Sequence, residues 1–397
     1  MILTTTYLKK NWVKLLVPIV IILLLGYYNY VINYSLGWKL IHRHHSKASA
    51  IVLWILVGFT QFTLFTYWIL IFVIGPGKSP KFPPLNLYGE ESDELIPLPD
   101  LFFCDESGFP YFCSNSQSIK LERSFFSKDV GYNVIKFDHY CIWIGHPIGQ
   151  DNYLFFMKFM ILFFSLFVIS LIYVAVYTRS SIALGEIDHN FIVLYIFCGL
   201  WIMMIGSLFG IHFRYVCVNM TTLDDITRNQ RKRYNRWREA QNKEKKVPEW
   251  MQPSVEPRKE TGRRYVNVKL GDTRVVVKYY IDSRPFDMGL KKNWINLIFN
   301  GNRNHGLDES LYTTTRFIAA LVVFWVPFID IPLCFKNRLR NKDEVEKFSN
   351  SEMLLHKYNT YSSVVNDKFM EEMDAKIKKG EYTIPKYLEP KDSDNTL

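Results

Sequence analysis

Four long segments of the chain contain no lysine, arginine, aspartate or glutamate and are rich in leucine, isoleucine, valine and phenylalanine. They are Leu15–Trp38, Ala48–Gly77, Phe159–Thr178 and His189–Phe213. Each has at least 20 residues, and a helix that rises about 1.5 Å per residue crosses a hydrocarbon core of about 30 Å in about 20 residues. The pattern predicts an all-α integral membrane protein with four transmembrane helices.

Polar segments lie between and after the two helix pairs. The loop Lys78–Lys158 separates the second helix from the third, and a hydrophilic tail runs from Arg214 to Leu397. Soon after the fourth helix the tail carries Arg214, Arg228, Arg231, Lys232, Arg233, Arg236 and Arg238. The loop between the last two helices has the single basic residue Arg179. Because positive residues favour the cytosolic side, we expect the central loop and both termini in the cytosol, although three basic residues between the first two helices weakly oppose this. Which cellular membrane holds the protein stays open.

The predicted helices divide the chain into five regions. These are 1–77 with the first helix pair, 78–153 with the central loop, 154–213 with the second pair, 214–341 as a cytosolic region, and 342–397 as a charged peripheral tail. The fourth region contains a further apolar run, Phe317–Ile329, of 13 residues. This run is short for a crossing, so we expect a buried or interfacial helix. Whether it enters the bilayer stays open.

Composition excludes several classes of protein. The four apolar segments exclude a purely soluble enzyme and a disordered chain, and six irregularly spaced cysteines in 397 residues exclude a secreted disulfide framework. The net charge of +10 would fit a nucleic-acid-binding protein, but basic flanks of membrane helices give the same total, so no nucleic-acid partner is expected. A channel or transporter is disfavoured because the charge-free segments lack the ionisable residues that mark ion paths.

The central loop contains a compact group of reactive residue types. Residues 137–145 read Phe-Asp-His-Tyr-Cys-Ile-Trp-Ile-Gly. Here Cys141 can act as a nucleophile, His139 as its base, and Asp138 as the group that orients the imidazole. A nearby imidazole raises the thiolate fraction of a cysteine. These three residue types can also fall together by chance in an ordinary polar loop, so the motif needs its context.

That context resembles the DHHC protein S-acyltransferases, or palmitoyltransferases, in the Asp-His-Tyr-Cys form known among fungal members. The resemblance covers most of residues 15–301. Residues 75–80 (Gly-Pro-Gly-Lys-Ser-Pro) resemble the family signature after the second helix, and Trp143, Gly149 and Asn152 match the pattern after the motif. Residues 219–224 (Asn-Met-Thr-Thr-Leu-Asp) resemble the Thr-Thr-x-Glu motif, with Asp224 replacing Glu. Residues 284–289 (Arg-Pro-Phe-Asp-Met-Gly), followed by Asn-Trp at 293–294, resemble an element of the family's tail.

By this resemblance Cys141 takes a fatty acyl group from acyl-CoA, typically palmitoyl-CoA, as an enzyme thioester. His139 is the base and Asp138 orients it. The acceptors are cysteines of membrane-associated proteins, and membrane lipids surround the helices. The alternative is a weak or inactive member that serves as a lipid- or partner-binding scaffold. The residues that contact CoA are not identified, and Lys120, Arg123, Lys128, Lys136 and the cluster Arg228–Arg238 are candidates.

The chain departs from the family at the metal-binding positions. Most members bind two zinc ions through six cysteines and two histidines, but here only Cys113 remains. The other positions hold Ser116, Phe126, Ser127, Val130, Asn133, Tyr140 and Pro147. Since a zinc site needs about four ligands, we expect no structural zinc and a small aromatic core in its place. His212, near the predicted end of the fourth helix, is expected to be interfacial.

Overall fold

A computed structural model describes residues 5–185, 188–242, 262–300, 309–333, 351–362 and 364–389. It divides into two compact units. The helical unit comprises Met1–Gly77, His139–Arg214 and Phe324–Pro327, and the mixed unit comprises Lys78–Asp138, Tyr215–Val323 and Phe328–Leu397. The protein is mostly helical, and each unit has its own kind of core.

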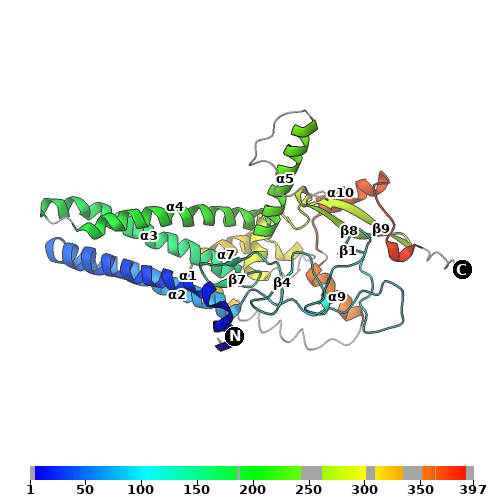
Figure 1. Cartoon of the computed structure of the whole chain (residues 1–397), viewed down its shortest axis with the longest axis horizontal. Helices are drawn as coiled ribbons and strands as arrows, with labels where there is room; N and C mark the ends of the chain where they lie inside the picture. The colour runs from blue at the N-terminus through cyan, green and yellow to red at the C-terminus, as the bar shows by residue number, and fades with distance from the viewer. Residues whose placement is uncertain are drawn as a thin grey trace. The chain divides into compact units, whose positions relative to one another are not determined.

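Four long apolar helices dominate the helical unit. The first, α1 (Thr5–Asn29), continues directly as a π-helix, η1 (Tyr30–His42), and is followed by α2 (Lys47–Ile74), α3 (Tyr153–Ala183) and α4 (His189–Val218). Figure 1 shows them side by side, with α1 and α2 in blue and α3 and α4 in green. All four are long and apolar enough to cross a membrane, so the prediction of four such helices is confirmed.

Aromatic side chains hold these helices together. Trp68 of α2 packs edge-on against Phe159 of α3, with ring centroids 5.7 Å apart, and Phe159 continues a row through Phe163. Other apolar side chains point outward, and Leu23 and Met203 are each 68% exposed. An apolar surface of this kind is unfavourable in water but is the expected surface toward lipid.

A buried lysine lies inside α3, one of the helices that are long and apolar enough to cross a membrane. Helix α3 begins at Tyr153, six residues before the charge-free segment, and therefore includes Lys158. The Lys158 ammonium is buried and donates to the Tyr67 hydroxyl at 3.3 Å and to the Val326 carbonyl at 3.0 Å. A charge in an apolar helix is tolerated when it has such partners. The expectation that the spans contain no charged residue is therefore wrong for α3.

The mixed unit contains a sheet, so the all-α prediction is wrong for this part of the chain. Strands β1 (Leu101–Cys104), β8 (Arg263–Leu270) and β9 (Thr273–Tyr280) form an antiparallel sheet in the order β1-β8-β9. The turn between β8 and β9 has only two residues, and Gly271 takes a φ of 60° there. Tight hairpin turns need such a positive φ.

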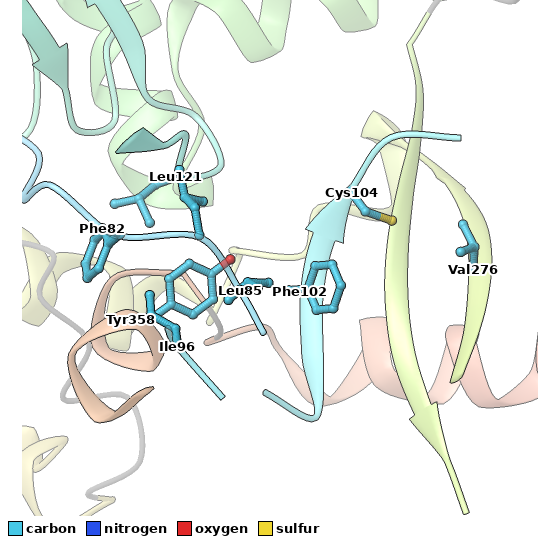
Figure 2. Packing of buried hydrophobic residues seen from close by; sticks show 9 residues of the cluster. Phe82, Leu85, Ile96, Phe102, Cys104, Leu121, Val276 and Tyr358 are labelled. Carbon is cyan, nitrogen blue, oxygen red and sulfur yellow. The ribbon is translucent and has the colours of Figure 1, made fainter. Parts of the chain in front are cut away.

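The core of the mixed unit joins distant segments. Figure 2 shows Tyr358 of α9 (Ser351–Ser362) beside Phe82, Leu85 and Ile96. The same cluster also contains Phe102, Cys104, Ile119, Leu121 and Val276. A second cluster buries Phe369 and Met373 of α10 (Asp367–Lys378) against the valines of β8 and β9. Two helices of the segment expected to be a peripheral tail thus contribute buried core residues.

The remaining strands are short, and the remaining helices vary in length. Three hairpins are formed by β2 (Phe112–Cys113) with β3 (Ser118–Ile119), β4 (Phe125–Ser127) with β5 (Tyr132–Val134), and β6 (His139–Cys141) with β7 (His146–Ile148). The others are α5 (Thr222–Asn242), η3 (Ile281–Ser283), α6 (Leu290–Ile295), η4 (Asn296–Asn300), η5 (Glu309–Leu311), α7 (Thr314–Trp325) and η6 (Lys386–Leu388). Helix α7 covers most of the predicted apolar run and ends two residues before Pro327.

Candidate active site

The reactive residues lie on the β6–β7 hairpin of the helical unit. His139 pairs with Ile148, and Cys141 pairs with His146. The turn closes with a hydrogen bond of 2.8 Å from the Gly145 N–H to the Cys141 carbonyl. Because residues two apart on a strand point to the same face, His139 and Cys141 share a face. A regular strand therefore places these two side chains on the same side of the hairpin.

Asn152 fixes this hairpin to the helices. Its side chain is fully buried and accepts a hydrogen bond from the Gly149 N–H at 3.0 Å. It donates to the carbonyls of Pro147, at 3.0 Å, and Ile71, at 3.3 Å. One amide therefore joins β7, the last turn of α2 and the start of α3, which explains why an asparagine follows the motif at this spacing.

The imidazole of His139 packs against aromatic rings of two helices. The ring centroid of Phe156, on α3, lies 5.4 Å away, and that of His212, on α4, lies 5.6 Å away. His212 is buried, and its Nδ1 lies 2.8 Å from the Tyr153 hydroxyl. Helix α4 continues six residues beyond His212 to Val218, so His212 is a buried residue within the helix, and its position at the membrane interface stays a prediction.

An apolar cavity of about 290 Å³ opens beside the hairpin, within the helical unit. Cys141 forms part of its wall, together with Trp68 of α2, Phe163 of α3 and Trp201 of α4. Cys141 is only 5% exposed, and what remains accessible borders this cavity. Along α4 the cavity extends from Ile211 to Trp201, ten residues that span about 15 Å of helix. Its size and lining suit a hydrocarbon chain.

Asp138, the last residue of its segment of the mixed unit, is held by Thr222. The Asp138 side chain is 1% exposed. Its Oδ1 accepts a hydrogen bond from the Thr222 N–H at 2.8 Å, and its Oδ2 accepts one from the Thr222 hydroxyl at 2.7 Å. The second threonine of the Thr-Thr-x-Asp segment thus fixes the carboxylate that precedes His139 in the chain.

The same segment forms the N-terminal cap of α5. Asp224 Oδ2 accepts a hydrogen bond from the Thr221 N–H at 3.1 Å, and the Thr221 hydroxyl accepts one from the Asp224 N–H at 3.2 Å. This reciprocal pair is a capping box, and the shorter Asp completes it in place of Glu. Arg123 supports it from the central loop, with its guanidinium 3.7 Å from Asp224 and over the ring of Phe286.

Lys136, two residues before Asp138, has a pKa that is clearly shifted from its ordinary value. It is partly buried, and burial, followed by the positive charge of Arg123, lowers the pKa of Lys136 to about 7. The carboxylates of Asp138 and Asp224 act in the opposite direction but are outweighed. Lys136 is therefore largely neutral in slightly alkaline solution, which weakens its case as a contact for CoA phosphates.

The residues at the eight metal positions do not fit two zinc ions. Phe126, Val130 and Pro147 offer no ligand atom. Asn133 instead donates a hydrogen bond of 2.8 Å to the Ser116 hydroxyl, which links the β2–β3 and β4–β5 hairpins directly. Among the described residues, no cluster of three His, Cys, Asp or Glu side chains close enough to hold a metal includes Cys113.

Comparison with known proteins gives consistent matches. The family model for DHHC palmitoyltransferases matches residues 106–229. The palmitoyltransferase PFA5 of Candida albicans is 65% identical over 389 residues, which cover 98% of this chain and 96% of that protein. PFA5 of Kluyveromyces lactis is 32% identical over 56% of this chain and 67% of that protein, and human palmitoyltransferase ZDHHC15 is 28% identical over 54% and 67%. The matched region includes both Cys141 and Thr222.

Proposed function

The chain belongs to the DHHC family of palmitoyltransferases, and from this premise we propose that Cys141 carries the acyl group during transfer to protein cysteines. The observation that supports this role most directly is the position of Cys141 in the wall of the apolar cavity. A thiol there can meet the carbonyl carbon of a thioester whose fatty chain lies between the helices.

The first step forms the acyl-enzyme. His139 accepts the proton of the Cys141 thiol, and the thiolate attacks the thioester carbonyl of acyl-CoA. The bond between the carbonyl carbon and the CoA sulfur breaks, and the CoA thiolate takes the proton from His139. One thioester replaces another, so little energy separates the two sides, and the enzyme acts mainly by positioning and ionising thiols.

The second step repeats the exchange with a new thiol. A cysteine of the acceptor protein gives its proton to His139 and attacks the Cys141 thioester. The bond between the acyl carbon and Cys141 breaks, and His139 returns the proton to the Cys141 sulfur. The acceptor leaves as a palmitoylated protein, and the free thiol is ready for another acyl-CoA.

The cavity supplies the binding energy for the donor. Burying each CH₂ group contributes about 0.8 kcal/mol, so a long chain is strongly favoured over a short one. The walls contributed by Phe163 and Trp201 are apolar and carry no group that would bind the polar CoA head. We therefore expect the head to remain in the aqueous phase while the chain enters between the helices.

Asp138 orients His139 in this proposal. Each oxygen of the carboxylate accepts one hydrogen bond from Thr222, but an ionised carboxylate offers about four acceptor sites. The remaining sites allow Asp138 to accept an N–H from the neighbouring imidazole. That bond selects the tautomer that can take the thiol proton and stabilises the cation that results.

The distribution of charge supports an orientation with the hairpin on the cytosolic side. The exposed residues Lys232, Arg233 and Arg236 lie on α5, which starts four residues after α4 ends. Positive residues at this distance from a span favour the cytosol. The hairpin with Cys141, both termini and the acceptor proteins then share the cytosolic side, where membrane-associated proteins present reduced cysteines and lipid head groups surround the helices.

The central loop folds without structural zinc in this proposal. Two features stabilise the loop in place of metal ligation. They are the hydrogen bond between Asn133 and Ser116 and the buried cluster around Phe82 and Ile119. The three hairpins persist although seven of the eight ligand positions hold other residue types.

Intact-mass measurement after addition of palmitoyl-CoA tests the function. The purified chain should gain one palmitoyl group that hydroxylamine removes, and the Cys141→Ala variant should gain none. Cys104→Ala is a control, since Cys104 is a buried thiol of the sheet. Labelling of Cys141→Ala at the parental level would remove Cys141 from the mechanism. Binding of palmitoyl-CoA without transfer to a thiol acceptor would instead indicate a lipid-binding scaffold.

A further inference from the structure

We propose that His212 is a positioning residue for the base His139, and that the Tyr153 hydroxyl holds His212 in place. This inference rests on the proposed roles of Cys141 and His139. All of the residues involved belong to the helical unit.

The first observation is the setting of His212. It is 3% exposed and lies in an otherwise apolar helix, where a polar ring is costly unless it is hydrogen-bonded. The Tyr153 hydroxyl, 2.8 Å from Nδ1, provides that bond. A hydrogen bond between this hydroxyl and Nδ1 fixes the orientation of the His212 ring, whichever of the two atoms is the donor.

The second observation is the contact with the base. The ring centroids of His139 and His212 are 5.6 Å apart, and a ring nitrogen of each lies within 4.8 Å of the other. Phe156 touches both rings at 67° and 84°, with centroids 5.4 and 5.0 Å away. His139 is therefore confined by one ring from α3 and one from α4. A shift of His212 would change where the base points relative to Cys141.

The third observation links this arrangement to the hairpin. Tyr153 directly follows Asn152, whose amide bonds to Gly149 and Pro147 of the hairpin segment. The backbone of Tyr153 is therefore held next to the residue that fixes the hairpin carrying Cys141. The hydrogen bond between Tyr153 and His212 joins α3 to α4. The hairpin, α3 and α4 are thus connected around the His139 imidazole.

The test measures acylation of Cys141 by palmitoyl-CoA in the full chain, with maximal rate and half-saturating donor concentration determined separately. Tyr153→Phe and His212→Phe keep an aromatic ring at each position but lose the hydrogen bond. Each should lower the maximal rate by about 10-fold to 10²-fold, since a misplacement of about 1 Å costs roughly 10²-fold. The half-saturating concentration should stay within about 2-fold of the parent, because the donor cavity is intact.

Two further variants separate positioning from packing. His212→Asn keeps an acceptor near the position of Nδ1 and should recover most of the rate lost in His212→Phe. The double variant Tyr153→Phe/His212→Phe should be no slower than His212→Phe alone, because both changes break one interaction. Tyr195→Phe is the matched control. It removes a hydrogen bond between α4 and α3, from the Tyr195 hydroxyl to Thr178 at 2.9 Å, far along the helices from the hairpin, and should retain the parental rate.

Each contrary result has a defined meaning. Parental rates in Tyr153→Phe and His212→Phe would overturn the proposal, and so would a change confined to the half-saturating concentration. An equal loss in Tyr195→Phe would assign the effect to general helix packing. A His212→Asn variant as slow as His212→Phe would exclude the Tyr153 bond as the cause. If the parent itself formed no adduct at Cys141, the proposed function would fail first, and that outcome is distinct from all of these.

Discussion

Thr222 donates two hydrogen bonds to Asp138, one from its N–H to Oδ1 at 2.8 Å and one from its hydroxyl to Oδ2 at 2.7 Å. Hydrogen bonds to charged groups are worth about 1.5–3 kcal/mol each. The first residue of α5 therefore controls the position of the carboxylate next to the proposed base, although the two residues are 84 positions apart.

Replacing Thr222 by valine removes the hydroxyl but keeps the shape and the N–H bond. We expect Thr222→Val to slow acylation of Cys141 about 10-fold, because Asp138 orients His139 less well, whereas Thr222→Ser should stay near the parental rate. Thr227→Val is the control, since the Thr227 hydroxyl bonds only along α5, to the Leu223 carbonyl. Equal rates for Thr222→Val and Thr227→Val would contradict a role for this contact.

His139 and Tyr140 give a matched pair on one strand. His139→Gln removes the base, and general-base catalysis typically contributes about 10²–10⁴-fold, so the rate of acyl-enzyme formation should fall by that order. Tyr140→Phe should change the rate less than about 3-fold, because the side chains of successive strand residues point to opposite faces. Single-turnover mass measurements distinguish the two. A similar loss in both variants would exclude His139 as the specific base.

Filling the cavity should change chain-length preference. Ile205 is 4% exposed and lines the cavity. Ile205→Trp adds volume there, so we expect transfer from palmitoyl-CoA to fall at least about 5-fold more than transfer from decanoyl-CoA, since each CH₂ excluded costs about 0.8 kcal/mol. Ile196→Trp, on the same helix but at a position that is 60% exposed, should leave both rates unchanged. Equal losses for both donors with Ile205→Trp would argue against chain binding in this cavity.

Lys136 should make stability depend on pH. Its pKa is about 7 in the folded protein and 10.5 in an unperturbed lysine, so between these values the unfolded chain binds more protons. The free energy of unfolding therefore rises with pH over this interval, and the destabilisation is complete below pH 7. Lys136→Met should raise the unfolding temperature most at low pH and flatten its rise toward pH 9. The exposed control Lys128→Met should keep the parental profile, and an unchanged profile in Lys136→Met would contradict the shift.

Metal removal should leave the fold unchanged. We expect zinc well below one equivalent per chain, and no change in unfolding temperature after treatment with a strong chelator, because Asn133 and Ser116 already connect the two hairpins. Asn133→Ala should lower the free energy of unfolding by about 1–2 kcal/mol, the usual cost of losing a buried hydrogen bond. Near-stoichiometric zinc would show that other ligands have replaced the lost cysteines.

The sequence predicted the long helices well because length and lack of charge are local properties. It ended the fourth helix at Phe213, since Arg214 ends that charge-free segment, and it placed the second helix pair from residue 154 although the third charge-free segment starts only at Phe159. The helices extend beyond these residues. This error hid His212, which looked terminal but is buried within α4.

The sheet could not be predicted in the same way. Strand β1 has four residues, and its partner β8 begins 159 positions after β1 ends. Such pairing depends on contacts that no local pattern records. Apolar residues alternate with polar ones in part of β8, where Val266 and Val268 share one face, and this alternation was a usable signal for a strand. The all-α prediction rested on the four apolar segments and did not use it. The proposed catalytic residues were found because Asp138, His139 and Cys141 are close in the chain, whereas Thr222 and Tyr153 are partners only in space.

The burial of Phe82 against Tyr358, with ring centroids 5.6 Å apart, sets an order on biosynthesis. Phe82 leaves the ribosome after two helices have been made, but the ring that covers it is translated more than 270 residues later. A premature stop codon between α5 and α9 would leave this apolar surface without Tyr358, even though every proposed catalytic side chain is present.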